Sequence, residues 1–255
     1  MSTESSAQAP TAALLIIGNE ILSGRTQDAN LIFIAKYLGG IGVRLREVRV
    51  VPDDEAEIVA AVNALRARYT YLFTTGGIGP THDDITSECI AKAFGVPLIQ
   101  HPEARRRLEA HYADSGLLNE ARLRMANTPK GAVLIDNPVS TAPGFQIGNV
   151  FVMAGVPSIM QAMLTGLGDR LAGGPPVLSR TVVCAVPEGT LAAGLGAVQA
   201  EFPDVDIGSY PAFRLGQIST SLVLRGTDPV RLDAAAERVA ALVTDLGGTP
   251  EIAAG

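Results

Sequence analysis

The residues best suited to chemistry lie in one run, Thr74-Thr75-Gly76-Gly77-Ile78-Gly79-Pro80-Thr81-His82-Asp83-Asp84-Ile85-Thr86. Glycines let the backbone approach a ligand closely, and successive N–H groups in such a loop form a nest that binds anions. The run follows a predicted strand and opens a predicted helix, whose N-terminus adds positive potential. Phosphate is therefore the expected ligand. The predicted ligand-binding residues of this loop are Thr75, Gly76, Gly77, Gly79, Pro80 and Thr81.

Two adjacent carboxylates, Asp83 and Asp84, stand beside this nest. They would repel a phosphate unless a divalent cation lay between them, so they indicate Mg²⁺, or Mn²⁺ in its place. The alternative is that both aspartates cap the following helix.

A second loop, Gly18-Asn19-Glu20-Ile21-Leu22-Ser23-Gly24, also follows a strand and leads to Asp28 and Asn30. Glu20 could reach the same metal or a ligand hydroxyl, while Gly18 and Asn30 are candidate ligand contacts. Gly, Asn and Ser are also ordinary loop residues, and Asp28 could simply cap its helix.

Two further loops could add backbone donors. Pro143 and Gly144 lie in the first, and Gly155 and Ser158 in the second, which runs from a strand into a helix. Ser158 is expected to cap that helix. The sequence has no Gly-x-Ser-x-Gly elbow or Ser/His/Asp arrangement, so covalent nucleophilic catalysis is not expected.

Histidine and cysteine contribute little. His82 lies within the main motif and could touch a phosphate, whereas His101 and His111 are expected on the surface. Cys89 and Cys184 are too few and too far apart for a disulfide framework, which favours a cytoplasmic protein, and both are expected to be small core residues.

The predicted elements that position these loops alternate between strands and helices. Residues 12–17 predict a strand buried on both faces. A helical stripe of apolar residues starts at Asp28, and Gly39, Gly40 and Gly42 are expected to stop it. Strands at 43–51 and 71–74 flank a helix capped by Asp53 or Asp54. This β-α-β-α-β pattern predicts a mainly parallel sheet between two helix layers, with ligands beyond the carboxyl ends of its strands.

The rest of the chain completes two domains. Helices are predicted at 85–94, from Pro102, and from Ser158 to about residue 171. Strands at 132–135 and 149–153 are separated by a loop, 137–145. The predicted organisation is a disordered tail at 1–11, a main α/β/α domain at 12–172, a linker at 172–176, and a small α+β domain at 177–255 with the order β-α-β-β-α.

Composition excludes some partners. The formal net charge of −6 and the pI near 5.1 give no field that would collect nucleic acid, and Arg105-Arg106-Arg107 reads as a solvated helix face. No apolar run approaches the roughly 18 residues that a membrane-spanning helix needs. The expected partner is therefore a small molecule.

The two main motifs resemble the amino-terminal region of competence/damage-inducible protein A (CinA) and the Mog/MoaB-like molybdopterin-binding domains. Thr-Thr-Gly-Gly-x-Gly-Pro-Thr-x-Asp-Asp-x-Thr is reproduced at 74–86, and Gly-x-Glu-x-Leu-x-Gly with a downstream Asn at 18–30. The small second domain looks like the KH-like domain of CinA-type proteins. It lacks an obvious basic Gly-x-x-Gly clamp, so RNA binding is not expected.

The resemblance implies a domain that binds molybdopterin or a nucleotide with Mg²⁺, in which Asp84 and Glu20 match functional acidic positions. It implies metal-dependent hydrolysis of a dinucleotide pyrophosphate such as ADP-ribose, or alternatively non-catalytic molybdopterin binding or molybdopterin adenylylation. It also implies a homo-oligomer, in a form without the carboxy-terminal amidohydrolase domain of full-length members. Under the hypothesis of pyrophosphate hydrolysis, the expected catalytic and metal-binding residues are Glu20, Asp83 and Asp84.

Overall fold

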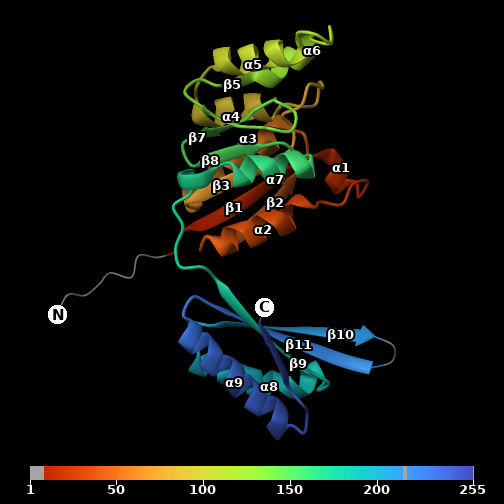
Figure 1. The fold of residues 1–255 in the computed structure, drawn as a ribbon, viewed down its shortest axis with the longest axis vertical. Helices are drawn as coiled ribbons and strands as arrows, with labels where there is room; N and C mark the ends of the chain where they lie inside the picture. Colours follow the sequence, from red (N-terminus) through yellow and green to blue (C-terminus); the bar gives the residue numbers. More distant parts are fainter. Residues whose placement is uncertain (1–8, 215–216, 255) are drawn as a thin grey trace, which may run out of the picture. The chain divides into compact units, whose positions relative to one another are not determined.

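The computed structural model describes residues 9–214 and 217–254 (Figure 1). Its contacts divide the chain into two compact units, Met1–Gly174 and Pro175–Gly255. Most of the tail predicted at 1–11 lies outside the described residues, and Thr11 is already the first residue of β1. Within the described ranges, no helix is long and apolar enough to cross a membrane.

The first unit is built on a six-stranded sheet in the order β2-β1-β3-β8-β7-β6. Its strands are β1 (Thr11–Ile17), β2 (Arg44–Val51), β3 (Tyr71–Thr75), β6 (Val133–Ile135), β7 (Gly144–Ile147) and β8 (Val150–Met153). The pairs β1–β2, β1–β3 and β3–β8 are parallel, which confirms the mainly parallel sheet. The pairs β7–β8 and β6–β7 are antiparallel.

Strand β7 was missed because its first residues fall in the predicted loop 137–145. The Pro, Gly, Ser and Thr content of that segment hid it. Phe145 is buried and pairs with Leu134 and Val152, so its position in the sheet depends on two partner strands that the local sequence does not indicate.

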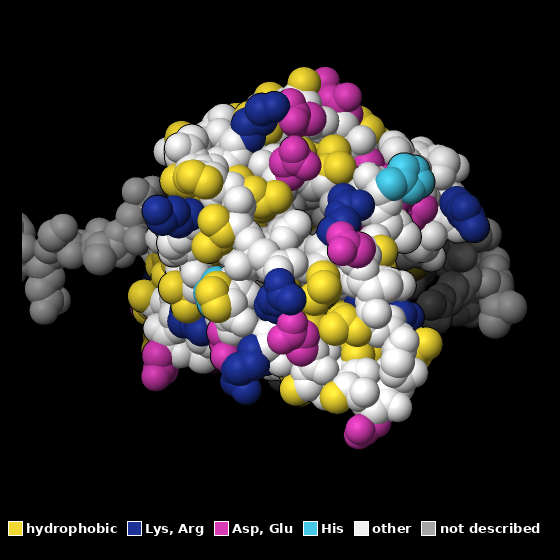
Figure 2. Space-filling view, turned by 90° about the horizontal axis from the view of Figure 1, so that it is seen from above, with side chains coloured by type: hydrophobic (Ala, Val, Ile, Leu, Met, Phe, Trp, Pro, Cys, Tyr) yellow, Lys and Arg dark blue, Asp and Glu magenta, His cyan; other side chains and the backbone are white. Residues whose placement is uncertain are grey.

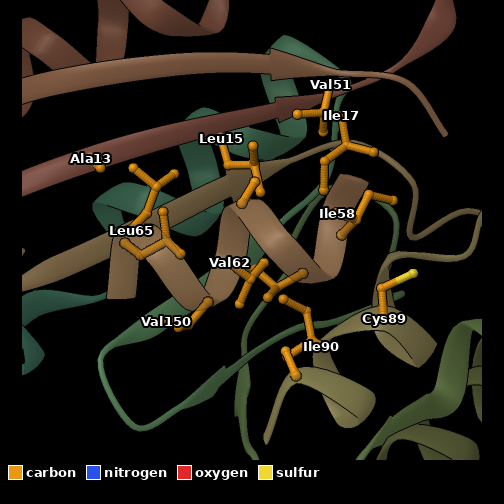
Figure 3. Packing of buried hydrophobic residues seen from close by; sticks show 14 of the residues in the cluster. Ala13, Leu15, Ile17, Val51, Ile58, Val62, Leu65, Cys89, Ile90 and Val150 are labelled. Carbon is orange, nitrogen blue, oxygen red and sulfur yellow. The ribbon is translucent and has the colours of Figure 1, made fainter. Parts of the chain in front are cut away.

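Helices cover both faces of this sheet (Figure 1). On one face, α2 (Asn30–Gly40) and α7 (Pro157–Thr165) share a core with the strands that includes Leu14, Phe73 and Phe151. On the other, α3 (Glu55–Arg68) and α4 (Thr86–Phe94) do so. Figure 3 shows the second core, in which Leu15 of β1 packs with Val62 of α3 and Ile90 of α4. The predicted three-layer α/β/α arrangement is confirmed.

An insertion between α4 and β6 carries its own small core. It comprises β4 (Leu98–Gln100), α5 (Pro102–Tyr112), α6 (Glu120–Leu123), the 3-10 turn η1 (Arg124–Ala126) and β5 (Asn127–Pro129). Strands β4 and β5 pair antiparallel, and Leu108 of α5 packs on Ala126 and Leu134. Of these elements, only α5 was predicted, from Pro102 at its first position.

The second unit contains β9 (Leu178–Cys184), α8 (Glu188–Glu201), β10 (Asp206–Arg214), β11 (Gln217–Gly226), α9 (Pro229–Asp245) and β12 (Glu251–Ala254). The sheet order is β10-β11-β9-β12 with antiparallel pairs, and both helices contribute to a single core with β9 and β11. The predicted β-α-β-β-α order is present, with β12 added. Its KH-like character stays a prediction.

The start of α3 and the end of α2 agree with the sequence expectation. Asp54, rather than Asp53, caps α3 by accepting hydrogen bonds from the N–H groups of Ala56 and Glu57. Helix α2 ends at Gly40, within the glycine-containing segment that was expected to stop it.

Ser158 does not cap α7. The N-cap is Val156 and Pro157 occupies the first helical position, where its missing N–H costs nothing. Ser158 lies one position further on, exposed in the first turn.

Candidate functional site

The carboxyl ends of β1, β3 and β8 are followed by loops whose backbones approach one another closely, and glycines make this approach possible. Gly76, after β3, has φ 101°, and a Cβ there would lie 2.2 Å from the carbonyl oxygen of Ile17 at the end of β1. A Cβ on Gly155, after β8, would lie 3.3 Å from the Cα of Gly76. The backbones of the three loops therefore approach more closely than larger residues would permit. The structure thus brings together loops that are far apart in the sequence.

Asn30, the first residue of α2, joins this convergence. Its Nδ2 donates a hydrogen bond of 2.8 Å to the carbonyl of Gly155. Its Oδ1 is buried and has no hydrogen-bond partner within the described part of the chain. The same is true of the hydroxyl groups of Thr74 and Thr75 at the end of β3. Because buried polar atoms are rarely left without partners, these three oxygens indicate that water or a ligand supplies them.

The loop after β3, which we call the nest, is the segment predicted to bind an anion. The N–H of Gly76 donates to Met153 O at 3.2 Å, whereas no hydrogen bond among the described residues uses the N–H groups of Gly77, Ile78 or Gly79. Gly77 has φ 67°, a left-handed conformation that favours glycine. Three consecutive donors thus remain available for an anion.

Thr86 holds the nest in place, a role that the sequence reasoning missed. Its buried hydroxyl donates to Gly76 O at 3.0 Å, and its N–H donates to Gly77 O at 3.0 Å. A Cβ on Gly77 would lie 2.2 Å from the Thr86 hydroxyl oxygen. The available signal was the position of Thr86 at the end of the motif, at the start of a predicted helix.

Asp84 closes the loop instead of capping α4. Its Oδ2 accepts hydrogen bonds from the N–H of Thr81, at 2.7 Å, and from the Thr81 hydroxyl. A Cβ on Gly79 would lie 2.7 Å from the same oxygen, so the carboxylate rests against the nest backbone. The N-cap position of α4 is Ile85, with no side-chain capping bond. The alternative that both aspartates are helix caps is therefore wrong.

Asp83 faces solvent beside Asp84, with 59% of its side chain exposed. His82 is almost fully exposed, and its Nδ1 lies 3.9 Å from Asp83 Oδ1.

The first loop presents Glu20 at the surface. Glu20 lies in the short helix α1 (Asn19–Leu22), and a Cβ on Gly18 would meet its carboxylate oxygens at 2.5 Å. The N–H of Gly18 donates to Val51 O at 3.2 Å, and that of Asn19 to Asp53 Oδ2 at 2.9 Å. Asp53 therefore ties this loop to the end of β2. Asp28 accepts from the N–H of Leu31, as the helix-start alternative supposed.

The candidate metal ligands are too few in one place to form a closed site. Within the described residues, no group of three or more His, Cys, Asp or Glu side chains could hold a metal ion. Glu20, Asp83 and Asp84 therefore do not form a ready-made three-carboxylate site. Mg²⁺ is commonly held by one or two carboxylates together with substrate phosphates, and the adjacent Asp83 and Asp84 fit that mode.

The third predicted loop contributes to packing. Pro143 and Gly144 are buried, and a Cβ on Gly144 would lie 2.3 Å from Val152 O, so glycine lets β7 approach β8. Asn137 holds the loop that precedes β7, because its side-chain amide donates hydrogen bonds to Ser140 Oγ and Ala142 O. Neither Pro143 nor Gly144 is among the residues that the structure places against Gly76.

The first unit of the chain matches a known protein family. Residues 13–173 match the model described as "Probable molybdopterin binding domain". The chain belongs to this family. The same region contains the three strand ends and the nest, so the molybdopterin-binding-domain fold is what positions the candidate site. The predicted resemblance is thereby confirmed.

Individual relatives extend this molybdopterin-binding-domain assignment. A protein of Pyrobaculum calidifontis is 38% identical over 212 residues, covering 79% of this chain and 81% of that protein. A CinA-like protein of Desulfosudis oleivorans is 36% identical and covers 77% of the chain, which spans 53% of that relative. The crystal structure of the protein CinA with unknown function from Thermoplasma acidophilum is 36% identical with a TM-score of 0.60, over 64% of this chain and 98% of that one.

The second unit has a separate match. Residues 176–246 match the family described as "FAD synthase, middle domain". A CinA-like molybdopterin-binding domain is thus followed by a domain similar to the middle part of FAD synthase.

Proposed function

We propose that the site binds a phosphorylated nucleotide or pterin together with Mg²⁺ or Mn²⁺, and that it hydrolyses a dinucleotide pyrophosphate such as ADP-ribose. One observation carries this proposal. The unused N–H groups of Gly77, Ile78 and Gly79 lie on the same short loop as Asp83 and Asp84. A diphosphate needs the donors, and the divalent cation that accompanies it needs the carboxylates.

The protein's contribution is mainly positioning. The nest holds one phosphate, and the Thr75 hydroxyl and Asn30 Oδ1 can satisfy polar groups of the ligand from the α2 side. Bound Mg²⁺ would neutralise phosphate charge at Asp83 and Asp84. A carboxylate, Asp84 or Glu20, orients water for attack on phosphorus. The P–O–P bond then breaks, and ADP-ribose and water give AMP and ribose 5-phosphate.

The second-unit match adds a candidate substrate. Because the family is described as the middle domain of FAD synthase, FAD is proposed beside ADP-ribose as a dinucleotide ligand. Both contain the same P–O–P linkage between two polyol-bearing halves.

The proposal is tested by incubating metal-stripped protein with ADP-ribose, FAD, NAD and ATP, with and without Mg²⁺ or Mn²⁺. Chromatography should show metal-dependent AMP release from ADP-ribose or FAD. Asp84→Asn should lower this rate by about 100-fold or more, because the loop loses its charged closure and its ion contact.

Asp114→Asn is the matched control, since this exposed carboxylate lies beyond the end of α5. It should retain the rate of the unaltered protein. A rate that survives Asp84→Asn in a clean preparation would overturn the hydrolytic mechanism.

A second candidate is non-catalytic molybdopterin binding, or adenylyl transfer to molybdopterin. The engagement of Asp84 Oδ2 by Thr81 favours it, since that oxygen is not free to act as a general base. Molybdopterin binding without turnover of any dinucleotide would select the first form. ATP consumption that depends on the pterin would select the second.

A further inference from the structure

A cavity of about 80 Å³ opens beside Asp84. One wall comes from Ser87 and Glu88 in the first turn of α4. The opposite wall comes from the insertion, through Arg124 of η1 and Asn127 of β5. Because Gly79 and Asp84 belong both to this cavity and to the nest loop, a ligand phosphate on the nest would place its next group here.

The polar groups of these walls have no partners of their own. Within residues 9–214 and 217–254, the side chains of Ser87, Glu88, Arg124 and Asn127 form no hydrogen bond or ion pair with another residue. Other arginines of the insertion do pair, as Arg105 does with Glu109 and Arg107 with Asp136. Donors and acceptors therefore face the cavity unused.

The mixture of charges restricts the ligand. A phosphate in the cavity would be repelled by Asp84 and Glu88, and a cation by Arg124. Figure 2 shows basic and acidic side chains intermingled on the face of the molecule that it presents, without a large area of one sign. A neutral group with several hydroxyls suits both signs, since it donates to carboxylates and accepts from guanidinium and amide groups.

The walls hold the carboxylates of Asp84 and Glu88, which can accept hydrogen bonds from the hydroxyl groups of a sugar. Carboxylate recognition of ribose hydroxyls is a general device in nucleotide-binding proteins.

We propose that this cavity is the sugar subsite of the nest, in which Glu88 accepts hydrogen bonds from ribosyl hydroxyls while Arg124 and Asn127 donate to them. The assignment rests on the proposed function, because it takes a phosphate on Gly77–Gly79 as the anchor. Glu88 and Arg124 thereby select a phosphate that carries a sugar over a bare phosphate.

Calorimetric titration with ribose 5-phosphate and with inorganic phosphate tests this assignment, because neither ligand contains a P–O–P bond to hydrolyse. The unaltered protein should bind ribose 5-phosphate more tightly than phosphate. Glu88→Gln and Arg124→Met should each weaken ribose 5-phosphate binding by about ten-fold while changing phosphate binding less than about two-fold. Glu109→Gln, on the exposed face of α5, is the matched control and should change neither.

Thermal unfolding of each variant shows whether it is folded, and both substitutions remove surface-accessible groups without opening a core. Unchanged affinity for ribose 5-phosphate in both variants overturns the sugar subsite. An equal loss for both ligands also overturns it, by placing Arg124 on the phosphate. Failure of the unaltered protein to hydrolyse any dinucleotide overturns the proposed reaction alone, since the titrations report the subsite separately.

Discussion

Two threonines of the main motif illustrate how similar residues take different roles. The Thr75 hydroxyl is buried at the end of β3 and has no partner in the described part of the chain. The Thr86 hydroxyl, also buried, donates to the carbonyl of Gly76. The first hydroxyl keeps an unused hydrogen-bonding capacity, whereas the second holds the backbone of the loop after β3.

Valine at each position separates these roles. Thr75→Val should leave the free energy of unfolding unchanged or slightly higher, because it removes an unpaired buried hydroxyl, and should weaken ADP-ribose binding by about five- to ten-fold. Thr86→Val should lower the free energy of unfolding by about 1–3 kcal/mol, because Gly76 O loses its donor. Urea denaturation and calorimetry measure the two quantities. A stability loss in Thr75→Val as large as that in Thr86→Val would contradict the assignment.

At the scale of elements, the candidate site depends on loops that follow parallel strands at the same edge of the sheet. Gly76 adopts φ 101° against Ile17 O, whereas Gly39 sits inside α2 with nothing within 4 Å of an added Cβ. The same substitution therefore has opposite consequences in a strand-end loop and in a helix.

Gly76→Ala should lower the free energy of unfolding by about 2–5 kcal/mol, since it adds backbone strain and a clash with another strand. Gly39→Ala should raise it by about 0.5–1 kcal/mol through the lower entropy of the unfolded chain. Denaturant midpoints compare the two variants directly. Equal effects of the two substitutions would show that the loop after β3 relaxes freely.

At the scale of the whole molecule, each of the two units has hydrophobic packing of its own. The first unit has a core on each side of its sheet, and the second unit has a single core between its sheet and α8 and α9. Each unit thus buries its own apolar surface.

Scanning calorimetry should accordingly show two unfolding transitions. Leu14→Ala, in the first unit, and Leu222→Ala, in the second, each truncate a fully buried side chain and should cost about 2–5 kcal/mol in one transition only. A single transition that both substitutions displace would show that the units unfold together.

The expected homo-oligomer and cytoplasmic location stay predictions. Gel filtration at micromolar concentration checks the first, and elution as a monomer would contradict it.

The sequence by itself determined the main layers and the chemical character of the site. Apolar runs such as 12–17 and the helical stripe of α2 are local patterns, so they predicted the parallel sheet before any partner strand was known. The residue types at 74–86 likewise predicted an acidic, glycine-rich phosphate loop, because donor groups and backbone freedom are properties of the residues themselves.

Only the tertiary structure decided how these parts meet. Strand β7, the closure of Asp84 on Thr81 and the contact of Gly155 with Gly76 all depend on partners elsewhere in the chain. The cavity is of the same kind, since Glu88 and Arg124 line it from two elements that come together only when the insertion packs against α4. Such contacts are set by packing between elements, which the local pattern of residues does not specify.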